Sequence, residues 1–472
     1  MIEFVDLYVM KRRKFFKTSI SITLSSIFTP LMFGRQKKQE IIRKNWAENL
    51  TYSAKKYYEP DSIGRLQKLV KNCDKLRVIG SRHSFNNIAN SKYNQISLKK
   101  LHQVIKLDEE SKTVTVQSGI SYGQLCPFLY EKGYALHNLA SLPHISIAGA
   151  CATATHGSGI NNNNLANAVS SFEFVNAEGE LITLSRKNGD KNFLGAVVGL
   201  GGLGVLTKLV IDLQPTYEMK QNVFQFLPLE QLKLNFDEIF SSGYSVSLFT
   251  DWQTDKLNQV WIKTRLDEEQ KFDSNSEFFG ATPAKENLLP VTTSSYHMND
   301  PSLDLSPVNC TEQMGVPRPW HEILPHFKMH FTPSHGEELQ SEYFIPRKNA
   351  LEAINVLQQL GEKIDPLLII SEIRIVKADK LWMSPCYQES CVTFHFTWKQ
   401  DFKALIKLLP IIEKELYPLG AKPHWGKIFT MSPQKIQSSY RKLDDFKTLL
   451  KEYDPHGKFY NNFLIRNLGS AK

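Results

Sequence analysis

Polar side chains interrupt two apolar segments of the chain at every second residue. The segment Ile369–Val376 carries Glu372 and Arg374 between aliphatic residues, and a second segment carries His395 and Thr397 between aromatic residues. This period of two is typical of a β-strand and places both polar residues of each segment on one face. Because charged groups are costly to bury without partners, this polar face lies either in water or among partners that the protein or a ligand supplies.

Two interpretations of this polar face are open. In the first, it is a salt-bridged sheet surface in contact with water. In the second, it binds a polyhydroxylated substrate through many hydrogen bonds, and its cations stabilise negative charge that develops during a reaction. Lys427, which ends the segment Pro423–Lys427, is a further cation for the second interpretation.

The rest of the chain predicts an α+β protein with an antiparallel sheet. Helical spacing is found at 60–72, 121–134, 346–360 and 401–416. Strand patterns are found at 76–79, 103–107, 113–116, 205–213, 217–229, 244–252, 260–264, 367–376 and 391–398, with a hairpin at 172–184. A strand pattern stops at Pro215, which we take as a domain boundary. The predicted parts are a leader over 1–44, a first domain over 45–215, a second over 216–417 and a C-terminal segment over 418–472.

Two segments are rich in small residues. The segment 139–159 is rich in Ala, Gly, Ser and Thr, which let the backbone approach a flat or charged ligand closely. The segment 199–204 matches the dinucleotide-binding pattern G-x-G-x-x-G. That pattern binds a dinucleotide where a helix follows it, and here the β-branched run 205–211 predicts a strand instead. We therefore reject a Rossmann site at these glycines.

Histidines occur in two places where they could have a chemical role. His83 lies in a turn after a predicted strand, where a single histidine is most often an ordinary loop residue. His321, His326 and His330 have the residue type of a metal site, but Pro325 interrupts any helix that would align them. We expect these three to be polar residues of an exposed segment, and we predict no metal site.

The net charge of +9 is concentrated at the N-terminus. Residues 1–44 carry +7 of it, which argues against nucleic acid as a partner of the main body. Arg12 and Arg13 precede an uncharged stretch, 18–34, that is rich in Ser and Thr. This order resembles a twin-arginine export signal, so we expect a periplasmic or secreted protein that meets the membrane only in transit. Tethering by an uncleaved leader and a cytoplasmic protein with an unused basic tail are the alternatives.

Six separated motifs, in order, resemble the vanillyl-alcohol-oxidase-type (PCMH-type) FAD-linked oxidoreductases. They are Gly80–Asn86, 140–149, 153–159, Ser371–Arg374, His395–Thr397 and Pro423–Lys427. The first looks like the flavin-attachment loop of that family, the next two like its FAD-binding loop, and the last three like its substrate-binding face. The resemblance covers residues 45–468 and extends, within the family, to the alditol oxidases.

The resemblance implies a two-lobed fold with FAD as the cofactor, bound covalently through His83. Arg82 stands where close relatives often have Gly, and it adds bulk and charge beside His83. Ala140 lies where the family controls oxygen access, and its small side chain favours an oxidase over a dehydrogenase. The other residues implied at the cofactor are Ile79, Gly80, Ser81, Ser141, Ser146, Gly149, Thr153, Ala154, Thr155, His156, Leu206 and His424.

The implied reaction oxidises the terminal hydroxyl of an alditol, of the xylitol or sorbitol type, to an aldose and reduces O₂ to hydrogen peroxide. The implied catalytic residues are Lys427, Arg374, Glu372 and His395, and the implied substrate-binding residues are Ser141, Glu372, Arg374, Thr397 and Lys427. The cations stabilise negative charge on the substrate oxygen, and the other groups hold and orient its neighbouring hydroxyls. A sugar-1,4-lactone oxidase of the arabinono- or gulonolactone type and a non-catalytic carbohydrate-binding relative are the alternatives.

Overall fold

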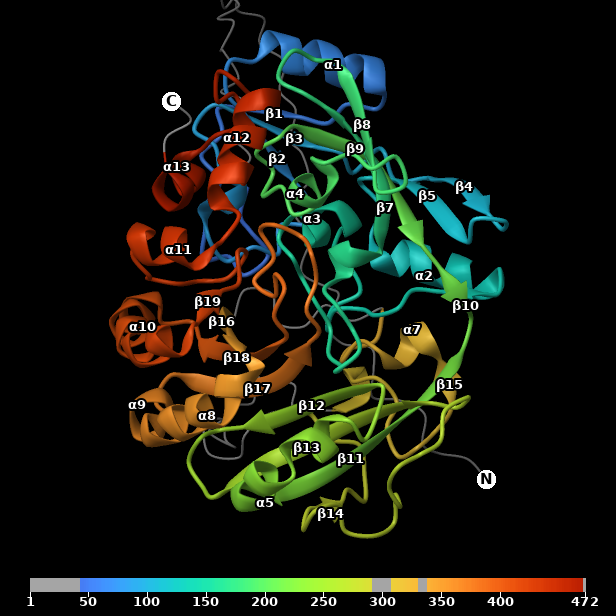
Figure 1. Cartoon of the computed structure of the whole chain (residues 1–472), viewed down its shortest axis with the longest axis vertical. Coiled ribbons are helices and arrows are strands. Elements are labelled where there is room, and N and C mark those ends of the chain that lie inside the picture. Colours follow the sequence, from blue (N-terminus) through green and yellow to red (C-terminus); the bar gives the residue numbers. More distant parts are fainter. Residues whose placement is uncertain (1–42, 291–306, 330–337, 470–472) are drawn as a thin grey trace, which may run out of the picture. The chain divides into compact units, whose positions relative to one another are not determined.

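The computed structural model describes residues 43–290, 307–329 and 338–469 (Figure 1). Residues 42–472 form one compact unit. The predicted export leader lies outside the described residues except for Arg43 and Lys44, both of which contact residues shortly after them. Within the described ranges, no helix is long and apolar enough to cross a membrane.

The first half of the chain builds small sheets. A parallel sheet contains β1 (Lys56–Tyr58), β3 (Asn94–Ser97) and β2 (Leu76–Ile79), in that order. An antiparallel sheet contains β4 (Val104–Asp108), β5 (Thr113–Gln117), β9 (Val205–Asp212), β7 (Val169–Val175) and β8 (Leu181–Ser185), in that order. A short pair joins β6 (Tyr134–Ala135) to β10 (Gln214–Pro215). The strand that follows the glycines of 199–204 is β9, so the rejection of a Rossmann site is confirmed.

Helices α1 to α4 accompany these sheets. They are α1 (Ile63–Asn72), α2 (Tyr122–Glu131), α3 (Ile147–Ala152) and α4 (Phe193–Ala196). α2 begins at a capping box, in which Ser121 and Gln124 each accept a hydrogen bond from the other's backbone N–H. This local signal explains why the helix predicted at 121–134 forms there.

The second half of the chain builds one nine-stranded antiparallel sheet. Its strands lie in the order β14-β11-β13-β12-β17-β18-β16-β19, and β15 also pairs with β11. They are β11 (Glu218–Pro228), β12 (Ser245–Thr250), β13 (Lys256–Arg265), β14 (Thr282–Pro283), β15 (Arg318–Pro319), β16 (Glu338–Pro346), β17 (Leu368–Val376), β18 (Cys391–Lys399) and β19 (Lys422–Pro423). The helices are α5 (Leu229–Leu234), α6 (Phe236–Phe240), α7 (Trp320–Ile323), α8 (Ala350–Gln359), α9 (Gly361–Ile364) and α10 (Phe402–Leu416). The α+β class predicted from the sequence is confirmed.

The sequence did not predict β16, which lies between β18 and β19. Four of its first five residues are polar, a density that is typical of a loop. They are nevertheless buried in the sheet, apart from Glu338, which is half-buried. Polar residues do alternate at 338, 340 and 342, as in a strand. Only one of the two residues between them is apolar, so the segment does not look like a strand in the sequence.

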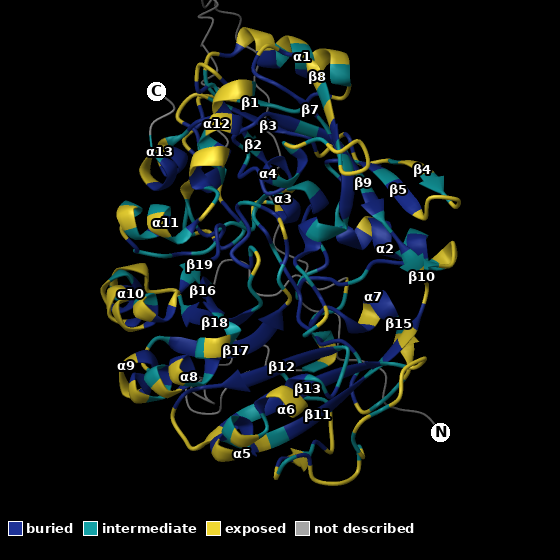
Figure 2. Cartoon of the chain, viewed as in Figure 1, coloured by how far each residue is buried: buried dark blue, intermediate teal, exposed yellow. Residues whose placement is uncertain are grey.

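The nine-stranded sheet is buried along its central strands, whereas the helices beside it expose one side (Figure 2). Every residue of β12 and of β17 is buried. On α10, Leu405, Leu409 and Ile412 face the core, which is the spacing of one helical stripe. Burial on both faces of the sheet means that polar residues on its strands must find partners within the protein.

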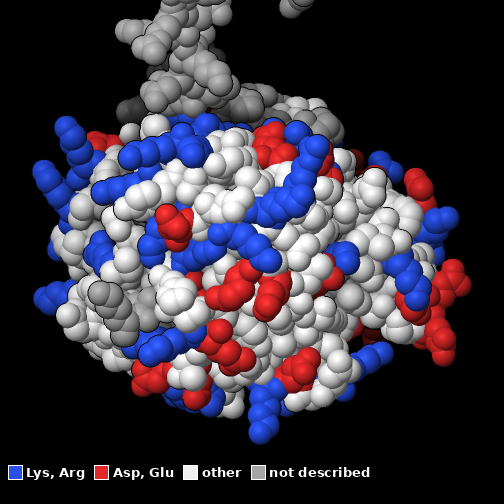
Figure 3. Space-filling model, turned by 90° about the horizontal axis from the view of Figure 1, so that it is seen from above, with Lys and Arg blue, Asp and Glu red and all other residues white. Residues whose placement is uncertain are grey.

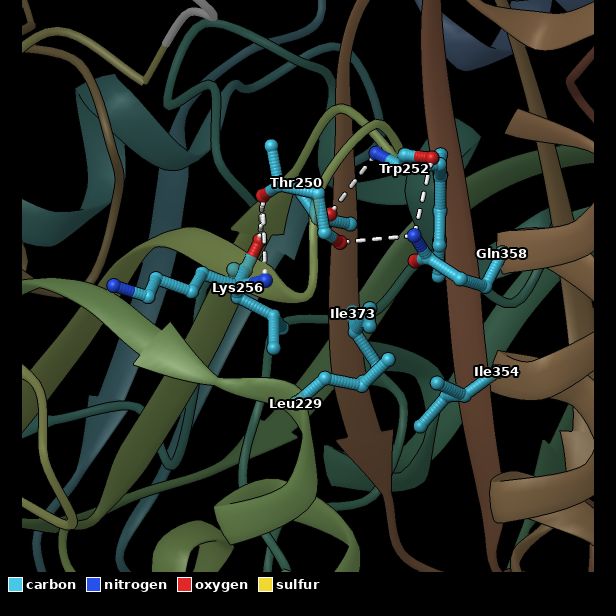
Figure 4. Close-up of a pocket in the computed structure, with 9 residues that line it drawn as sticks. Leu229, Thr250, Trp252, Lys256, Ile354, Gln358 and Ile373 are labelled. Atoms are coloured by element: carbon cyan, nitrogen blue, oxygen red, sulfur yellow. Dashed lines mark hydrogen bonds between the residues drawn. The ribbon is translucent and has the colours of Figure 1, made fainter. Parts of the chain in front are cut away.

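A small apolar pocket lies on one face of this sheet (Figure 4). Ile373 of β17 lines it together with residues of α5 and α8. Gln358 closes one side by donating hydrogen bonds to backbone oxygens of the turn after β12. Because Glu372 and Arg374 flank Ile373 in the strand, they point to the opposite face.

Charges of both signs are interspersed on the face of the molecule seen from above in Figure 3. An exposed ion pair joins Arg65 of α1 to Asp61, and the nitrogen and oxygen lie 2.7 Å apart. Both side chains are at least half exposed, so water screens their attraction.

The C-terminal segment packs back on the first half of the chain (Figure 1). It contains α11 (Pro433–Ser439), α12 (Leu443–Tyr453) and α13 (Asn462–Leu468), and α12 contacts α4. The Lys458 ammonium donates to the backbone oxygens of Val70 and Ala177, at 2.7 and 2.6 Å. The last residues of the chain therefore complete the body that the N-terminal sheets begin.

Arg77 of β2 holds the C-terminal segment against the first half of the chain. It is 2 % exposed, and its guanidinium donates to the backbone oxygens of Leu200, Gly201 and Phe459 at 2.9, 2.7 and 2.8 Å, and to that of Ile88. Burial lowers the pKa of Arg77 to about 10, so the group remains charged at neutral pH. One side chain thus joins three separate parts of the sequence.

We expect Arg77→Met to lower the free energy of unfolding by about 3–5 kcal/mol, because it leaves several buried carbonyl oxygens without a donor. The matched control is Arg65→Met, which removes an exposed ion pair and should cost less than about 1 kcal/mol. Urea unfolding of the two variants measures the difference. Equal effects of the two substitutions would contradict the role assigned to Arg77.

Candidate active site

Three neighbouring strands align a row of buried polar residues. Glu372 of β17 stands opposite His395 of β18, and His395 stands opposite Glu342 of β16. Their exposed fractions are 4 %, 9 % and 2 %. The burial of this row rules out the interpretation of a salt-bridged surface in water. Glu342 was not predicted as a site residue, because β16 itself was not predicted.

Arg374 holds this row together. Its Nη2 donates to Glu342 Oε1 at 2.9 Å, its Nε lies 3.5 Å from Glu372 Oε1, and its Nη1 lies 3.5 Å from Ser141 Oγ. Ser141 comes from the small-residue segment of the first half of the chain, so Arg374 joins that segment to the large sheet. The predicted residues Arg374, Glu372 and Ser141 are therefore brought together.

Both carboxyl groups of the row are ionised. Burial would raise the pKa of Glu342, but His156 and Arg374 outweigh it and hold that pKa well below its ordinary value. Burial also opposes ionisation of Glu372, and Arg374 and His326 again outweigh it and lower the pKa. Burial alone would lower the pKa of Arg374, yet the two carboxylates raise it.

Lys427 reaches the same face from the segment after β19. Its ammonium donates to Gln340 Oε1 and lies 4.8 Å from the centre of the Phe85 ring. Gln340 stands opposite Thr397 in the sheet, and Thr397 Oγ1 lies 3.3 Å from His395 Nε2. Burial lowers the pKa of Lys427 to about 8, against the pull of nearby carboxylates. The cation and the hydroxyl predicted for the substrate are thus on adjoining positions.

Two further histidines reach the row. His156 Nε2 lies 3.1 Å from Glu342 Oε1, and its Nδ1 lies 2.8 Å from the backbone oxygen of the next residue. His424 stacks on Phe344 with ring centroids 6.1 Å apart, and its Nδ1 accepts a hydrogen bond from the backbone N–H of Gly426 at 3.0 Å. Burial lowers the pKa of His424 to about 3, so its ring is neutral.

The expectation of an exposed histidine segment at 321–330 is wrong for two of its members. His326 is 7 % exposed and its Nε2 lies 2.8 Å from Glu372 Oε1, and His321 is also buried. His330 lies outside the described residues. In the described part of the chain, no group of three His, Cys, Asp or Glu side chains has the arrangement of a metal site. The helix here, α7, ends at Ile323, and His326 lies beyond it.

The predicted cofactor loops meet at Ser146, the N-cap of α3. The backbone N–H of Ser146 donates to Ser81 Oγ at 3.0 Å. A Cβ atom added at Gly80 would lie 2.5 Å from Ser146 Oγ, and one added at Gly149 would lie 2.7 Å from it. Gly80 thus lets its loop lie close to Ser146, and Gly149 leaves room for the same hydroxyl within its own segment.

His83 is held between aromatic rings in the same region. It stacks on Trp46 with centroids 4.9 Å apart, and its ring centroid lies 4.6 Å from that of His144. Burial, with nearby His144, Lys427 and Arg82, lowers the pKa of His83 well below its ordinary value, so the ring is neutral. Arg82 is exposed, and its guanidinium donates to the backbone oxygen of Lys44 at 3.1 Å.

The remaining predicted cofactor residues are placed as follows. Thr153 Oγ1 donates to the backbone oxygen of Gly149 at 3.1 Å and lies 3.2 Å from Thr155 Oγ1. Ala154 has a left-handed backbone, with φ of 54°. Ile79 ends β2 next to Gly80. Leu206 lies on β9, opposite Phe174 of β7, and not in the hydrogen-bonded cluster described above.

Comparison with known proteins is consistent with two functional parts. Residues 54–185 match the family model of an FAD binding domain, and residues 326–467 match that of D-arabinono-1,4-lactone oxidase. The chain is 41 % identical over 423 residues to an alditol oxidase from Streptomyces sp., covering 89 % of this chain and 97 % of that protein. It is 27 % identical over 444 residues to an L-gulono-1,4-lactone dehydrogenase from Mycobacterium tuberculosis, covering 91 % and 99 %.

Solved structures share the fold at lower identity. A solvent-stable cholesterol oxidase superimposes with a TM-score of 0.72 at 15 % identity, covering 91 % of this chain and 97 % of that one. A cholesterol oxidase from Brevibacterium sterolicum gives a TM-score of 0.70, also at 15 % identity, covering 94 % and 100 %. This likeness shows a common fold.

We expect Glu342→Gln to lower the free energy of unfolding by about 3 kcal/mol at neutral pH, since it leaves Arg374 with one carboxylate partner. Because folding lowers the pKa of Glu342, its stabilisation is present above the ordinary value of 4.5 and is lost as the pH falls through the folded value. The gap between wild type and variant should therefore be constant at neutral pH and shrink in strong acid.

Urea unfolding at a series of pH values measures that gap. The control is Glu178→Gln, which changes an exposed carboxylate in the turn between β7 and β8 and should show no comparable gap. A gap for Glu342→Gln that does not narrow in acid would contradict the assigned ionisation.

Proposed function

Because this chain belongs to the family of FAD-linked alditol and sugar-lactone oxidases, we propose that it oxidises the terminal hydroxyl of an alditol, such as xylitol or sorbitol, to the aldose and reduces O₂ to hydrogen peroxide. The observation that carries the proposal is the buried row of Glu372, His395 and Glu342, with Arg374 and Lys427 beside it. Buried groups that donate and accept in alternation suit a ligand with a hydroxyl on every carbon.

FAD is the cofactor, and the residues present fit it. The segment 139–159, which meets the Gly80 loop at Ser146, is rich in small residues that let the backbone approach a ligand closely. His144 has both ring nitrogens buried without a hydrogen-bond partner among the described residues, beside the neutral ring of His83. An unsatisfied polar ring at this position is what a bound polar group would complete.

Different residues of the site act on different parts of the substrate. The Lys427 ammonium stabilises the substrate oxygen as its hydroxyl gives up a proton. Arg374 supports the same developing charge, and Glu372 and Thr397 orient neighbouring hydroxyls by accepting and donating hydrogen bonds. Ser141 reaches the same place from the cofactor side, within 3.5 Å of Arg374.

The reaction balances with O₂ as the acceptor. The terminal carbon loses a hydride and its hydroxyl loses a proton, so that the C–O bond becomes a C=O bond. Bound FAD supplies the two-electron chemistry that takes up the hydride. Two electrons and two protons then leave with O₂ as hydrogen peroxide. The small, buried side chain of Ala140 supports access of O₂ to this site.

A sugar-1,4-lactone is the second candidate substrate. It is favoured by the match of residues 326–467 to the D-arabinono-1,4-lactone oxidase model. The identity to the alditol oxidase, at 41 % against 27 % for the lactone dehydrogenase, favours the alditol. A non-catalytic carbohydrate-binding role is opposed by the presence of the charged groups that a reaction needs.

The test is a peroxide assay with xylitol, sorbitol, L-gulono-1,4-lactone and D-arabinono-1,4-lactone. We expect turnover with the alditols, and bleaching of the flavin absorption when xylitol is added without oxygen. Turnover on lactones alone would replace the first substrate class with the second. A colourless protein without flavin would support the non-catalytic interpretation.

We expect Lys427→Met to lower kcat/KM for xylitol by about a hundredfold, because one charged donor to the developing oxyanion is lost. The pKa of Lys427 is about 8, so in wild type kcat/KM should fall as the pH rises above that value and the charge is lost. The variant should lack this fall. Lys403→Met, an exposed lysine on α10, is the control and should keep both the rate and the pH profile. Near-normal turnover in Lys427→Met would remove it from the catalytic set.

We propose that FAD is joined covalently to His83, whose neutral ring is a suitable nucleophile. Flavin fluorescence should then stay with the denatured protein on a gel and disappear in His83→Ala. His102→Ala, an exposed histidine before β4, is the control. Fluorescence that persists in His83→Ala would move the bond to another residue.

We propose that residues 1–44 direct export, on the basis of Arg12 and Arg13 before an uncharged stretch. Replacing both arginines by lysine should retain the protein in the cytoplasm, as measured by cell fractionation. Wild type found in the cytoplasmic fraction would favour a cytoplasmic protein, and a variant that is exported as wild type is would contradict the role of the two arginines.

A further inference from the structure

We propose that Lys263 and His326 form a positioning pair that fixes the Glu372 carboxylate for substrate binding. The inference rests on the proposed function, because it concerns how Glu372 meets a substrate hydroxyl. Neither residue belongs to the motifs by which the chain resembles its relatives, and both are buried, with 1 % and 7 % of their surface exposed.

The ammonium of Lys263 has three acceptors around it. Nζ lies 2.7 Å from the backbone oxygen of Leu324, 2.9 Å from that of Pro325 and 3.2 Å from His326 Nδ1. An ammonium has three N–H donors and no lone pair. All three donors are therefore used, and the third is aimed at a ring nitrogen.

The contacts on both sides of the ring decide where the proton of His326 lies. In its charged form Lys263 Nζ can only donate, so Nδ1 of a neutral His326 accepts from it. The ionised Glu372 carboxylate can only accept, which places the ring proton on Nε2. His326 Nε2 lies 2.8 Å from Glu372 Oε1 and therefore donates to it. The charge of Lys263 thus orients the hydrogen bond that His326 donates to Glu372.

The contacts of Glu372 leave one oxygen for a ligand. His326 Nε2 and Arg374 Nε both lie near Oε1, at 2.8 and 3.5 Å. Among the described residues, Oε2 makes no such contact and is the oxygen that a substrate hydroxyl can reach. A carboxylate with one oxygen anchored and one open is pre-organised for binding.

His326 is itself held in place on every side. Its ring packs edge-on against Trp261 and Phe249, at centroid distances of 5.3 and 5.7 Å. Its backbone N–H donates to the backbone oxygen of Ser141 at 3.1 Å. One residue therefore contacts both Ser141 and Glu372, two of the proposed substrate-binding residues.

The charges facing this pair favour a neutral ring. Lys263 and Arg374 lower the pKa of His326, Glu372 raises it, and burial, the largest cause, brings it to about 4. Lys263 faces Glu372, Arg374 and the thiol of Cys310, and burial lowers its own pKa to about 7. Without the lysine charge, the balance at His326 shifts towards protonation.

Kinetics with xylitol test the pair in the flavin-loaded enzyme. We expect His326→Leu to raise KM by about tenfold to a hundredfold with a smaller change in kcat, since it removes a donor to a binding carboxylate. His326→Gln restores an N–H donor and a neighbouring oxygen acceptor, so it should recover most of the loss. An unchanged KM in His326→Leu, or a Gln variant no better than Leu, overturns the proposal.

The tautomer of His326 gives a readout that does not depend on turnover. In ¹⁵N-histidine-labelled enzyme, the signal that is lost in His326→Gln should show a neutral Nε2–H ring near neutral pH. Lys263→Met should raise the pKa of that ring, and Lys256→Met, an exposed lysine on the same strand, should not. A ring protonated on Nδ1 in wild type, or a ring that ignores Lys263→Met, overturns the proposal.

The two hypotheses can fail separately. If wild type oxidises no alditol, the proposed function fails while the tautomer measurement still decides the pair. If wild type oxidises xylitol and the tautomer is Nδ1–H, the pair fails and the function stands.

Discussion

The buried guanidinium of Arg374 is the interaction on which the site depends. A charge at 6 % exposure is tolerable only with close partners, and Arg374 has Glu342 at 2.9 Å and Glu372 at 3.5 Å. Each carboxylate then needs further donors, which His156 and His326 provide. The charge of Arg374 is therefore balanced by carboxylates on β16 and β17, and these carboxylates in turn bind the loops that carry the two histidines.

Much of the fold was predictable where a strand or helix carries a clean local signal. β17 and β18 were found because polar and apolar residues alternate along them, β9 because it is a β-branched run, and β2 because it is a short apolar run. β16 was not, because its first residues are polar and their burial depends on Arg374 and Lys427, which lie elsewhere in the sequence. A local pattern cannot report a partner that only the fold supplies.

The same limit explains which site residues could be predicted from the sequence and which could not. His83, Glu372, Arg374 and Lys427 lie in motifs that can be compared with relatives, and the structure brings the last three onto one face. Glu342, His326 and Lys263 escaped because each is a buried partner of another group rather than part of a motif. His326 was noticed only as a candidate metal ligand, and the alternation of Gln340 and Glu342 in β16 was a sequence signal that pointed to Glu342.

The return of the C-terminus sets an order of events during protein synthesis. The backbone N–H of Phe85 donates to Gly426, Asn86 donates to the backbone oxygens of Trp425 and Lys427, and Arg77 donates to Phe459. The loop that carries His83 therefore lacks its C-terminal supports until the ribosome has made nearly the whole chain. A chain shortened by its last helix and the residues just before it loses the anchor at Phe459, although every cofactor-loop residue is still present.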